Sequence, residues 1–321
     1  MRIIVTCMKN EGPFILEWIA YHLSIGFEKF LIYTNDCTDQ TDAIADRLAE
    51  MNIIEHLDNP RIGNQRPQAV AMRDMFKRNI VRDAEWVLFS DCDEFLNIRL
   101  GDGHLDDLFA AMSDDLVISP MWRLFGDAGI VDYEDKPVIE QFLRAAPEKR
   151  PVSVNSWGFK SMFRISDNID RIGAHRPFYK DLDLVRGHWR AGNGDEMPAG
   201  LYEQGWRYTR PGGGYDWVQL NHYAVRSVDS FLVKCDRGHV LHTNKDIDLG
   251  YHQGMSHNHE RDDTILRRIG PFQETLTMLK EDATLARLHD ETVAHHRRRA
   301  LELRTEYADL FDTLQKKAAQ A

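Results

Sequence analysis

The chain has 321 residues, 43% of them hydrophobic, and carries a formal net charge of −11 at pH 7. This apolar content excludes a disordered chain and is enough for one large α/β domain or two smaller ones. The acidic balance argues against nucleic acid as a partner. Four well-separated cysteines with no CxxC pair favour free thiols in a reducing compartment.

The first half of the chain alternates strand-like and helix-like patterns, which predicts crossover units and a mostly parallel sheet. Short apolar runs predict strands at 3–6, 29–34, 52–57 and 85–90, and helical spacing predicts helices at 13–25, 42–51 and 67–78. Polar loops follow the strands at Thr6, Thr34 and Ser90. Because ligands of parallel sheets bind beyond the carboxyl ends of the strands, we expect one crevice to collect these loops.

The pattern changes from about Leu116 onward. LVISPMWRLFG and KSMFRIS predict further strands, and the glycine-rich stretch 186–216 predicts a mobile loop at a site. Near the C-terminus, apolar residues at helical spacing predict one amphipathic helix through Leu303, Tyr307, Leu310 and Leu314. We expect a domain over 1–240, with halves 1–115 and 116–240, and a mostly helical extension over 241–321.

The stretch WVLFSDCDEFL at 86–96 joins a strand buried on both faces to an acidic turn. Asp91, Asp93 and Glu94 lie within four residues, and like charges this close raise one another's pKa unless a cation neutralises them. The stretch is therefore either an exposed turn in which water screens the repulsion, or a metal site. Side chains two apart on a strand point the same way, so Asp91 and Asp93 can address one ligand.

Four stretches resemble glycosyltransferases, in the expected order. VTCMKNEG resembles a first strand and nucleotide loop, NDCTDQT a DDGSTDGT-like loop, and WVLFSDCDEFL a DxD strand; FKSMFRI, GAH and LNHYAVRSVDSFLVKCDRG resemble a second-half signature. Together they cover roughly residues 1–240. The ordered set resembles the family 2 type of glycosyltransferase, close to the subgroup shared with family 92. That resemblance implies the GT-A fold, a Rossmann-like, mostly parallel α/β sheet flanked by helices, here followed by the helical extension.

The resemblance implies a metal-dependent, inverting enzyme that transfers a sugar from a nucleotide-sugar donor, expected to be a UDP-sugar, to a hydroxyl of a carbohydrate or lipid-linked acceptor. Mn²⁺ or Mg²⁺ would offset the charge of the leaving diphosphate. Asp93 would coordinate the ion, and Asp91 would meet the ion or the ribose. A histidine from the second half, His175 or His222, would add a ligand. The alternative for each is a structural role, as an imidazole packed at the edge of the core.

The resemblance also implies contacts to the donor. The candidate residues are Thr6, Lys9 and Glu11 beside the base, Asp36 on the base or ribose, Arg66 and Arg73 near the base or phosphates, and Lys234 and Arg237 on the diphosphate. An inverting transfer needs a carboxylate base. Asp127 is the first candidate, and Asp195 and Glu196 are the next. On this interpretation, stretch 186–216 closes over the substrates, and Trp189, Trp206 and Trp217 offer flat faces to sugars.

Two other classes deserve comparison. A haloacid dehalogenase-type phosphohydrolase carries its DxD after the first strand and before Thr or Val, whereas Glu94 follows it here. A non-catalytic nucleotide-sugar-binding protein is the main alternative, because no catalytic base stands out. No stretch of about 18 apolar residues occurs, so we expect a soluble, cytoplasmic protein. We expect HHRRR at 295–299 on a solvated helix face; the alternative is peripheral contact with an anionic membrane.

Overall fold

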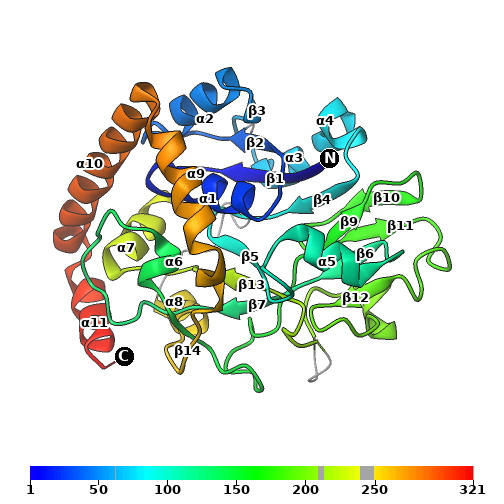
Figure 1. The fold of residues 1–321 in the computed structure, drawn as a ribbon. Helices are drawn as coiled ribbons and strands as arrows, with labels where there is room; N and C mark the ends of the chain where they lie inside the picture. The colour runs from blue at the N-terminus through cyan, green and yellow to red at the C-terminus, as the bar shows by residue number, and fades with distance from the viewer. Residues whose placement is uncertain (62, 209–212, 239–248, 321) are drawn as a thin grey trace.

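The computed structural model describes residues 1–61, 63–208, 213–238 and 249–320. Its centre is a seven-stranded sheet with the order β12-β6-β9-β4-β1-β2-β3 (Figure 1). The strands are β1 (Arg2–Met8), β2 (Lys29–Thr34), β3 (Ile54–Asp58), β4 (Trp86–Phe89), β6 (Val117–Ser119), β9 (Met162–Arg164) and β12 (Trp189–Ala191). Neighbours run parallel except β9, which is antiparallel to β4 and β6. The predicted mostly parallel α/β sheet of the GT-A fold is confirmed.

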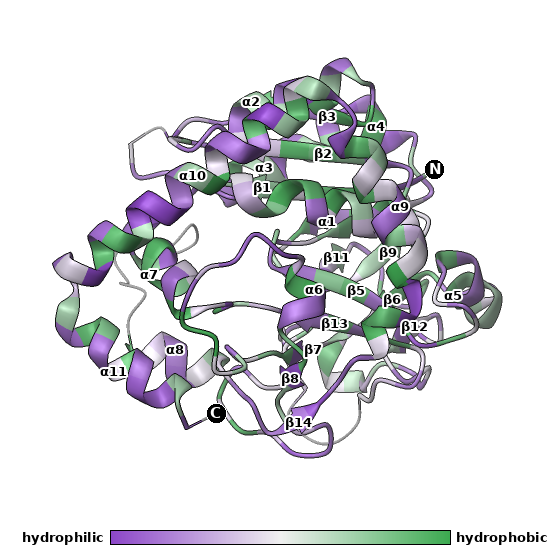
Figure 2. Ribbon diagram, turned by 60° about the vertical axis from the view of Figure 1, so that its left-hand side comes forward, coloured by the Kyte–Doolittle hydropathy of each residue, from purple (hydrophilic) through white to green (hydrophobic). Residues whose placement is uncertain are grey.

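The central strands β1, β2 and β4 are mostly apolar and buried, because helices cover both faces of the sheet. On one face lie α1 (Gly12–Ser24) and α2 (Thr41–Glu50), and on the other lies α3 (Pro67–Asp74). Ile4 of β1 belongs to the hydrophobic cluster under α1 and α2, whereas Ile3 and Val5 belong to the cluster under α3. Figure 2 shows hydrophobic residues concentrated on the central strands and mixed polarity along α10.

A second sheet continues the DxD strand. Its order is β5 (Glu94–Ile98), β13 (Val218–His222), β7 (Met121–Leu124), with β13 antiparallel to β5 and parallel to β7. In this register His222 lies opposite Glu94. The turn between β4 and β5 therefore connects the two sheets, and it carries Asp91 and Asp93.

The remaining elements are short strands, short helices and a C-terminal set of helices. They are η1 (Met75–Lys77), α4 (Asn79–Arg82), α5 (Leu105–Met112), α6 (Val138–Gln141), β8 (Arg144–Ala145), β10 (Ile169–Ile172), β11 (Pro177–Tyr179), η2 (Ala199–Leu201), α7 (Val228–Arg237), α8 (Leu249–Met255), β14 (Glu260–Arg261), η3 (Thr264–Arg268), α9 (Ile269–Lys280), α10 (Ala283–Glu306) and α11 (Ala308–Ala318). Helices α9 and α10 pack on α1, and α10 also packs on α2 and α7. No helix among the described residues is long and apolar enough to span a bilayer.

The structure corrects two of the predictions, and a third falls on residues outside the described ranges. The single helix predicted through Leu303 and Leu314 is two helices, because the helical backbone conformation is interrupted at Tyr307, whose φ and ψ are −114° and 46°. The glycine-rich stretch is not one loop, since β12 within it joins the central sheet, while 209–212 lie outside the described residues. The boundary expected at 240 also lies outside them.

Candidate active site

The acidic turn after β4 is neutralised by two lysines. Asp93 is buried; its Oδ2 accepts a hydrogen bond from Lys234 Nζ at 2.8 Å, and its Oδ1 lies 3.5 Å from His222 Nε2. Asp91 Oδ2 accepts from Lys160 Nζ at 3.0 Å, and its Oδ1 accepts from Gln68 Nε2 at 3.0 Å. Internal cations, rather than water, therefore offset the repulsion between these acids.

Glu94 holds the turn in shape. Its buried Oε2 accepts hydrogen bonds from the Asp91 backbone N–H and from Ser90 Oγ, both at 2.9 Å. Its Oε1 accepts from Trp122 Nε1 at 2.7 Å. Burial raises the pKa of Glu94, and the nearby Lys160 opposes that rise. Glu94 is thus a structural carboxylate that fixes where Asp91 and Trp122 lie.

Charge pairing sets the protonation of the groups around the turn. Burial alone would raise the pKa of Asp93, but Lys234 and His222 hold it well below its usual value. Burial would lower the pKa of Lys160, but Asp91 and Glu94 raise it; Asp93 does the same for Lys234. At neutral pH the turn therefore holds an ionised Asp93 paired with the Lys234 ammonium, and a charged Lys160 beside Asp91 and Glu94.

The loop after β1 is tied to the second half of the chain through Glu11. The buried Glu11 carboxylate pairs with Arg226 at 3.1 Å and with Arg237 at 2.5 Å. Arg237 also donates to the Lys9 carbonyl at 2.7 Å, and Arg226 donates to the Cys92 carbonyl at 3.3 Å. The network brings the nucleotide loop, the acidic turn and α7 together at the carboxyl ends of the strands.

The two candidate histidines both contact the ring of Trp122. The His222 ring is 4.7 Å from the Trp122 ring, and the His175 ring is 5.4 Å from it. His222 faces Asp93, whereas His175 Nδ1 hydrogen-bonds the Phe159 carbonyl at 3.0 Å. Of the two, His222 is the one placed against a carboxylate of the turn.

A divalent cation fits this arrangement only if another molecule completes its coordination. No three His, Cys, Asp or Glu side chains in the described ranges converge as a ready-made metal site. Asp93 Oδ1 and His222 Nε2, 3.5 Å apart, have the spacing of two ligands each about 2.1 Å from one ion. Mg²⁺ is commonly held by one or two protein ligands with phosphate and water oxygens supplying the rest, so the pair suits a cation bound with a diphosphate.

The next residues are those expected to contact the nucleotide-sugar donor. Thr6 is buried on β1, and its Oγ1 has no hydrogen-bond partner among the described residues. Asp36 is exposed in the loop after β2 with φ 47°, and Asn10 joins the β1 and β2 loops by a 3.0 Å bond to Thr38. Arg66 is exposed at the start of α3. Thr6 therefore lies within β1 rather than after it, Asp36 follows β2 and Arg66 precedes α3, and no described contact assigns any of them a ligand.

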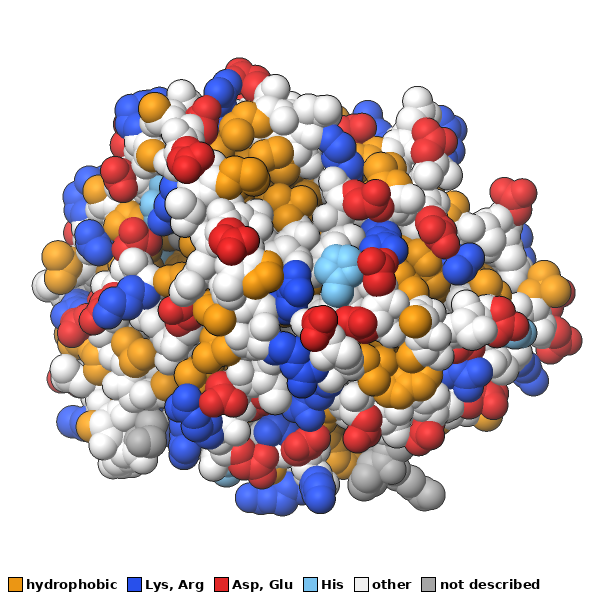
Figure 3. Space-filling view, in the orientation of Figure 1, with side chains coloured by type: hydrophobic (Ala, Val, Ile, Leu, Met, Phe, Trp, Pro, Cys, Tyr) orange, Lys and Arg blue, Asp and Glu red, His pale blue; other side chains and the backbone are white. Residues whose placement is uncertain are grey.

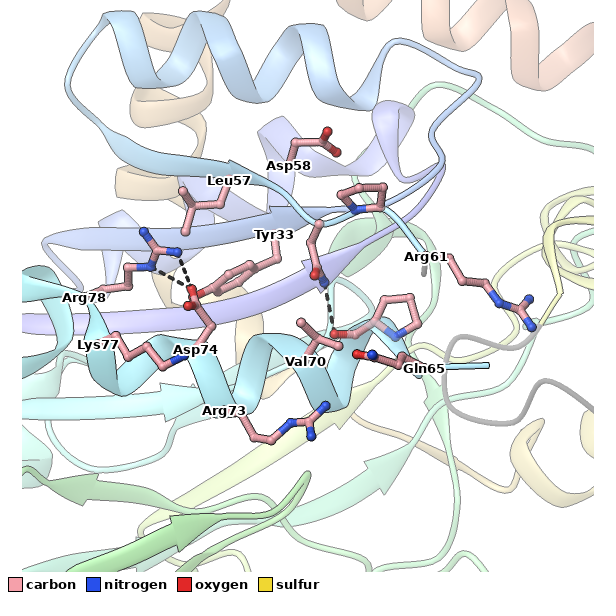
Figure 4. A pocket seen from close by; sticks show the side chains of 13 residues that line it. Tyr33, Leu57, Asp58, Arg61, Gln65, Val70, Arg73, Asp74, Lys77 and Arg78 are labelled. Atoms are coloured by element: carbon pink, nitrogen blue, oxygen red, sulfur yellow. Dashed lines mark hydrogen bonds and ion pairs between the residues drawn. The ribbon is translucent and has the colours of Figure 1, made fainter. Parts of the chain in front are cut away.

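Arg73 lines a pocket of about 530 Å³ on the α3 side of the sheet (Figure 4). Tyr33 forms its floor and donates to Asp74 Oδ2 at 3.0 Å, which Arg78 also contacts at 2.6 Å. The remaining lining residues are Leu57, Asp58, Asn59, Pro60, Arg61, Gln65, Pro67, Val70 and Lys77. In Figure 4, Arg73 and Arg61 extend away from Tyr33, so these cations do not converge on one point.

The described hydrogen bonds and ion pairs of the three candidate bases are made with residues other than those of the acidic turn. Asp127 is buried; its Oδ1 accepts from Asn258 at 2.9 Å and Gly129 N at 3.0 Å, and its Oδ2 pairs with His252 at 3.4 Å. Burial would raise the pKa of Asp127, but His252 and these donors lower it. Asp195 is exposed and bonds Asn193 at 2.6 Å, and Glu196 accepts from Tyr202 at 3.1 Å.

Sequence reasoning missed Lys160 and Arg226. Both stand inside quoted stretches, FKSMFRI and LNHYAVRS, so the available signal was a cation within an otherwise apolar, strand-like segment. Lys160 is buried between Asp91 and Glu94, and the Arg226 guanidinium lies 3.6 Å from the Phe14 ring centre. A buried cation of this kind implies a buried acid as its partner.

Known proteins resemble parts of this chain. The sequence profile of glycosyltransferase family 92 matches residues 3–183. A family 92 protein of Ricinus communis is 34% identical over 103 residues, covering 30% of this chain and 17% of the relative. One of Oryza sativa subsp. japonica is 27% identical over 168 residues, covering 47% and 27%. The aligned part is thus a small share of either plant protein.

Solved structures give a weak overall match. S. aureus TarS in complex with UDP is 18% identical over 51% of this chain and 47% of its own, with a TM-score of 0.31. HddC from Yersinia pseudotuberculosis is 10% identical over 51% and 77%, with a TM-score of 0.28. The family profile, in contrast, spans more than half of the residues, from β1 through the acidic turn to β11. The chain belongs to glycosyltransferase family 92.

Proposed function

We propose that this chain is a metal-dependent glycosyltransferase that moves a sugar from a UDP-linked donor to a hydroxyl of a glycan or lipid-linked acceptor, with inversion. The observation that supports it best is the turn at the carboxyl end of β4, where Asp93 lies against both His222 and Lys234. Family membership supports the reaction class. Donor, acceptor and cation are the proposed parts.

In this proposal, Asp93 and His222 hold Mn²⁺ or Mg²⁺ together with the donor diphosphate. The cation supplies Lewis-acid stabilisation of the diphosphate as it leaves. The Lys234 ammonium, which contacts Asp93 in the structure, would turn toward a phosphate oxygen. Arg237, which Glu11 holds in place, would donate hydrogen bonds to the same diphosphate. Lys160 keeps Asp91 ionised and oriented. A role of these groups in holding the diphosphate and its cation would explain why so many charges are buried at one strand end.

The base that takes the acceptor proton is proposed among Asp127, Asp195 and Glu196. Asp127 is ionised at neutral pH, but its lowered pKa makes it a weak base, and its oxygens are engaged. Asp195 and Glu196 follow β12, on a loop that a bound acceptor could reorder. A carboxylate-to-amide change in the true base should abolish transfer while donor binding persists.

The proposal is tested by thermal unfolding with UDP and Mn²⁺. Binding of UDP at a hundredfold excess over Kd stabilises the fold by about 2.7 kcal/mol. We expect this stabilisation to disappear with EDTA and in Asp93→Asn, but to persist in Asp102→Asn, which changes an exposed acid at the start of a distant turn. Equal shifts with and without EDTA would refute the metal role, and release of UDP from a UDP-sugar by the wild type tests the reaction class.

A further inference from the structure

We propose that Trp206, His175 and Trp122 form a binding platform for a pyranose ring of the acceptor. The inference deepens the proposed function, on which it rests, because it names the acceptor class as a carbohydrate that stacks beside the acidic turn. It also gives His175 a role different from that of a metal ligand.

The three rings form one contiguous aromatic surface. The Trp122 and Trp206 ring centres are 5.9 Å apart, and the His175 ring lies 5.3 Å from Trp206 and 5.4 Å from Trp122. Trp206 is 36% exposed, whereas Trp122 and His175 are covered more fully beneath it. Trp206 thus presents an exposed ring supported by the buried Trp122 and the half-buried His175, with the Arg207 guanidinium 5.8 Å from its centre. An aromatic face of this kind suits stacking with a ligand.

Hydrogen bonds and close packing hold this platform in place beside the acidic turn. Trp122 donates to Glu94 Oε1 at 2.7 Å, and its backbone N–H donates to the Gly158 carbonyl at 2.6 Å. A Cβ at Gly158 would lie 2.3 Å from the Trp122 ring, so only glycine permits this close approach. The Trp206 carbonyl accepts from Phe159 N at 3.0 Å. A ligand on the platform would thus keep a fixed distance from the turn.

His175 supplies a polar partner beside the flat face. Burial, helped by nearby Lys160, lowers its pKa to about 4, so the imidazole is neutral at pH 7. Its Nδ1 lies 3.0 Å from the Phe159 carbonyl and must carry the proton to donate there. Nε2 is then an acceptor for a hydroxyl hydrogen. An apolar face with one adjacent acceptor matches a pyranose, whose ring C–H groups stack and whose hydroxyls donate.

The position suits the acceptor better than the nucleotide. Trp122 links the platform to the acidic turn, because its ring contacts that of His222, which faces Asp93. No described contact joins the platform to the loop after β1, which Glu11 and Arg237 tie to α7. A sugar on Trp206 would therefore lie beside the acidic turn.

The test compares Trp206→Ala and Trp206→Phe with Tyr307→Ala, which removes an aromatic residue of similar exposure, 40%, at the end of α10. Each protein is applied with UDP and Mn²⁺ to an array of immobilised oligosaccharides, and saccharides that bind the wild type are titrated as free methyl glycosides. We expect Trp206→Ala to weaken binding about tenfold or more, Trp206→Phe to weaken it less, and Tyr307→Ala to leave it unchanged.

UDP release from the donor without acceptor is measured in parallel in the wild type and in Tyr307→Ala, and should be the same in these two proteins. That readout tests the proposed function, whereas saccharide binding tests the platform. The platform is wrong if the wild type captures no saccharide, if Trp206→Ala binds like the wild type, or if Tyr307→Ala loses as much. If saccharide binding depends on Trp206 but no donor is ever cleaved, the platform stands and the proposed reaction fails.

Discussion

Lys160 shows how one buried side chain makes an acidic turn compatible with a folded core. Its Nζ lies 3.0 Å from Asp91 Oδ2 and 3.4 Å from Glu94 Oε2, so a single ammonium serves two carboxylates. Glu94 in turn binds the Asp91 backbone. Removing the cation would leave these acids without a counter-charge in a poorly hydrated place, which costs far more than losing a surface pair.

We therefore expect Lys160→Met to lower the free energy of unfolding by about 3–5 kcal/mol, measured by urea denaturation at pH 7. The matched control is Lys136→Met, because Lys136 pairs with Glu134 at 2.5 Å on the surface and should cost no more than about 1 kcal/mol. Similar losses in the two variants would show that the Lys160 ion pairs contribute nothing beyond an ordinary surface contact.

The residues of the site divide by what a sequence can reveal. Asp91 and Asp93 were predictable because like charges at the end of a buried strand demand a neutralising group. Their actual partners, Lys160 and Lys234, are 69 and 141 positions away along the chain. No local pattern encodes such a separation. Lys234 was found through the resemblance to a family motif, and Lys160 was not found at all.

At the scale of elements, α10 braces the helix that carries the basic site residues. Arg304 pairs with Asp229 at 2.7 Å near the start of α7, and Arg299 pairs with Asp236 at 2.8 Å near its end. The basic run 295–299 is therefore only partly a solvated face: Arg297 and Arg298 are exposed, whereas His296 is buried. The position of Lys234 and Arg237 thus depends on contacts from the C-terminal helices.

This bracing predicts a specific defect in Arg304→Ala. Asp229 is buried and would lose its guanidinium partner, so we expect about 1–3 kcal/mol of stability to be lost. Protection of α7 amides from hydrogen exchange should fall more than that of β1 amides. Arg287→Ala, which removes an exposed pair with Glu291 on the same helix, is the control. Uniform loss of protection in both elements would contradict a local brace.

Elements were predicted well where periodicity and boundary signals agree. β2 occupies the predicted residues 29–34, since its apolar run is bounded by polar residues on both sides. Helix α3 ends at Asp74, before the predicted end, and continues as a 3₁₀ turn at Met75. The break at Tyr307 was missed because Leu303 and Leu314 are both buried, so the apolar spacing persists across two helices. Spacing alone cannot reveal such a change of axis.

At the scale of the whole molecule, acidic and basic side chains are interspersed over the face seen in Figure 3. The groups whose protonation affects stability in acid are instead buried histidines. Burial lowers the pKa of His22 and of His296 to about 3, and of His175 to about 4. His22 illustrates the cause: Nδ1 faces the Trp18 carbonyl at 2.8 Å, and Nε2 accepts from Leu96 N at 3.3 Å. A second ring proton would point at an N–H group.

The sign of the pH effect follows from these directions. A histidine whose pKa is lowered on folding contributes stability that is present above its unfolded pKa, near 6.5, and is lost as pH falls toward the folded value. Glu17 acts oppositely, because burial raises its pKa to about 7, so its contribution is lost as pH rises from 4.5 to 7. His22, His175 and His296 therefore make the fold less stable as pH falls below 6.5, whereas Glu17 and Glu94, whose pKa burial raises, act against that trend.

Each of these histidines contributes a slope of about 1.4 kcal/mol per pH unit where its folded form is neutral and its unfolded form is protonated, against a total stability of about 5–15 kcal/mol. His296→Gln should flatten the dependence of unfolding free energy on pH by about 1.4 kcal/mol per unit between 6.5 and 4.5, measured by urea denaturation. The control is its neighbour, His295→Gln, which makes the same substitution at a half-buried ring on the same helix. If His296→Gln keeps the wild-type slope, burial of neutral histidines does not set the acid limit of the fold.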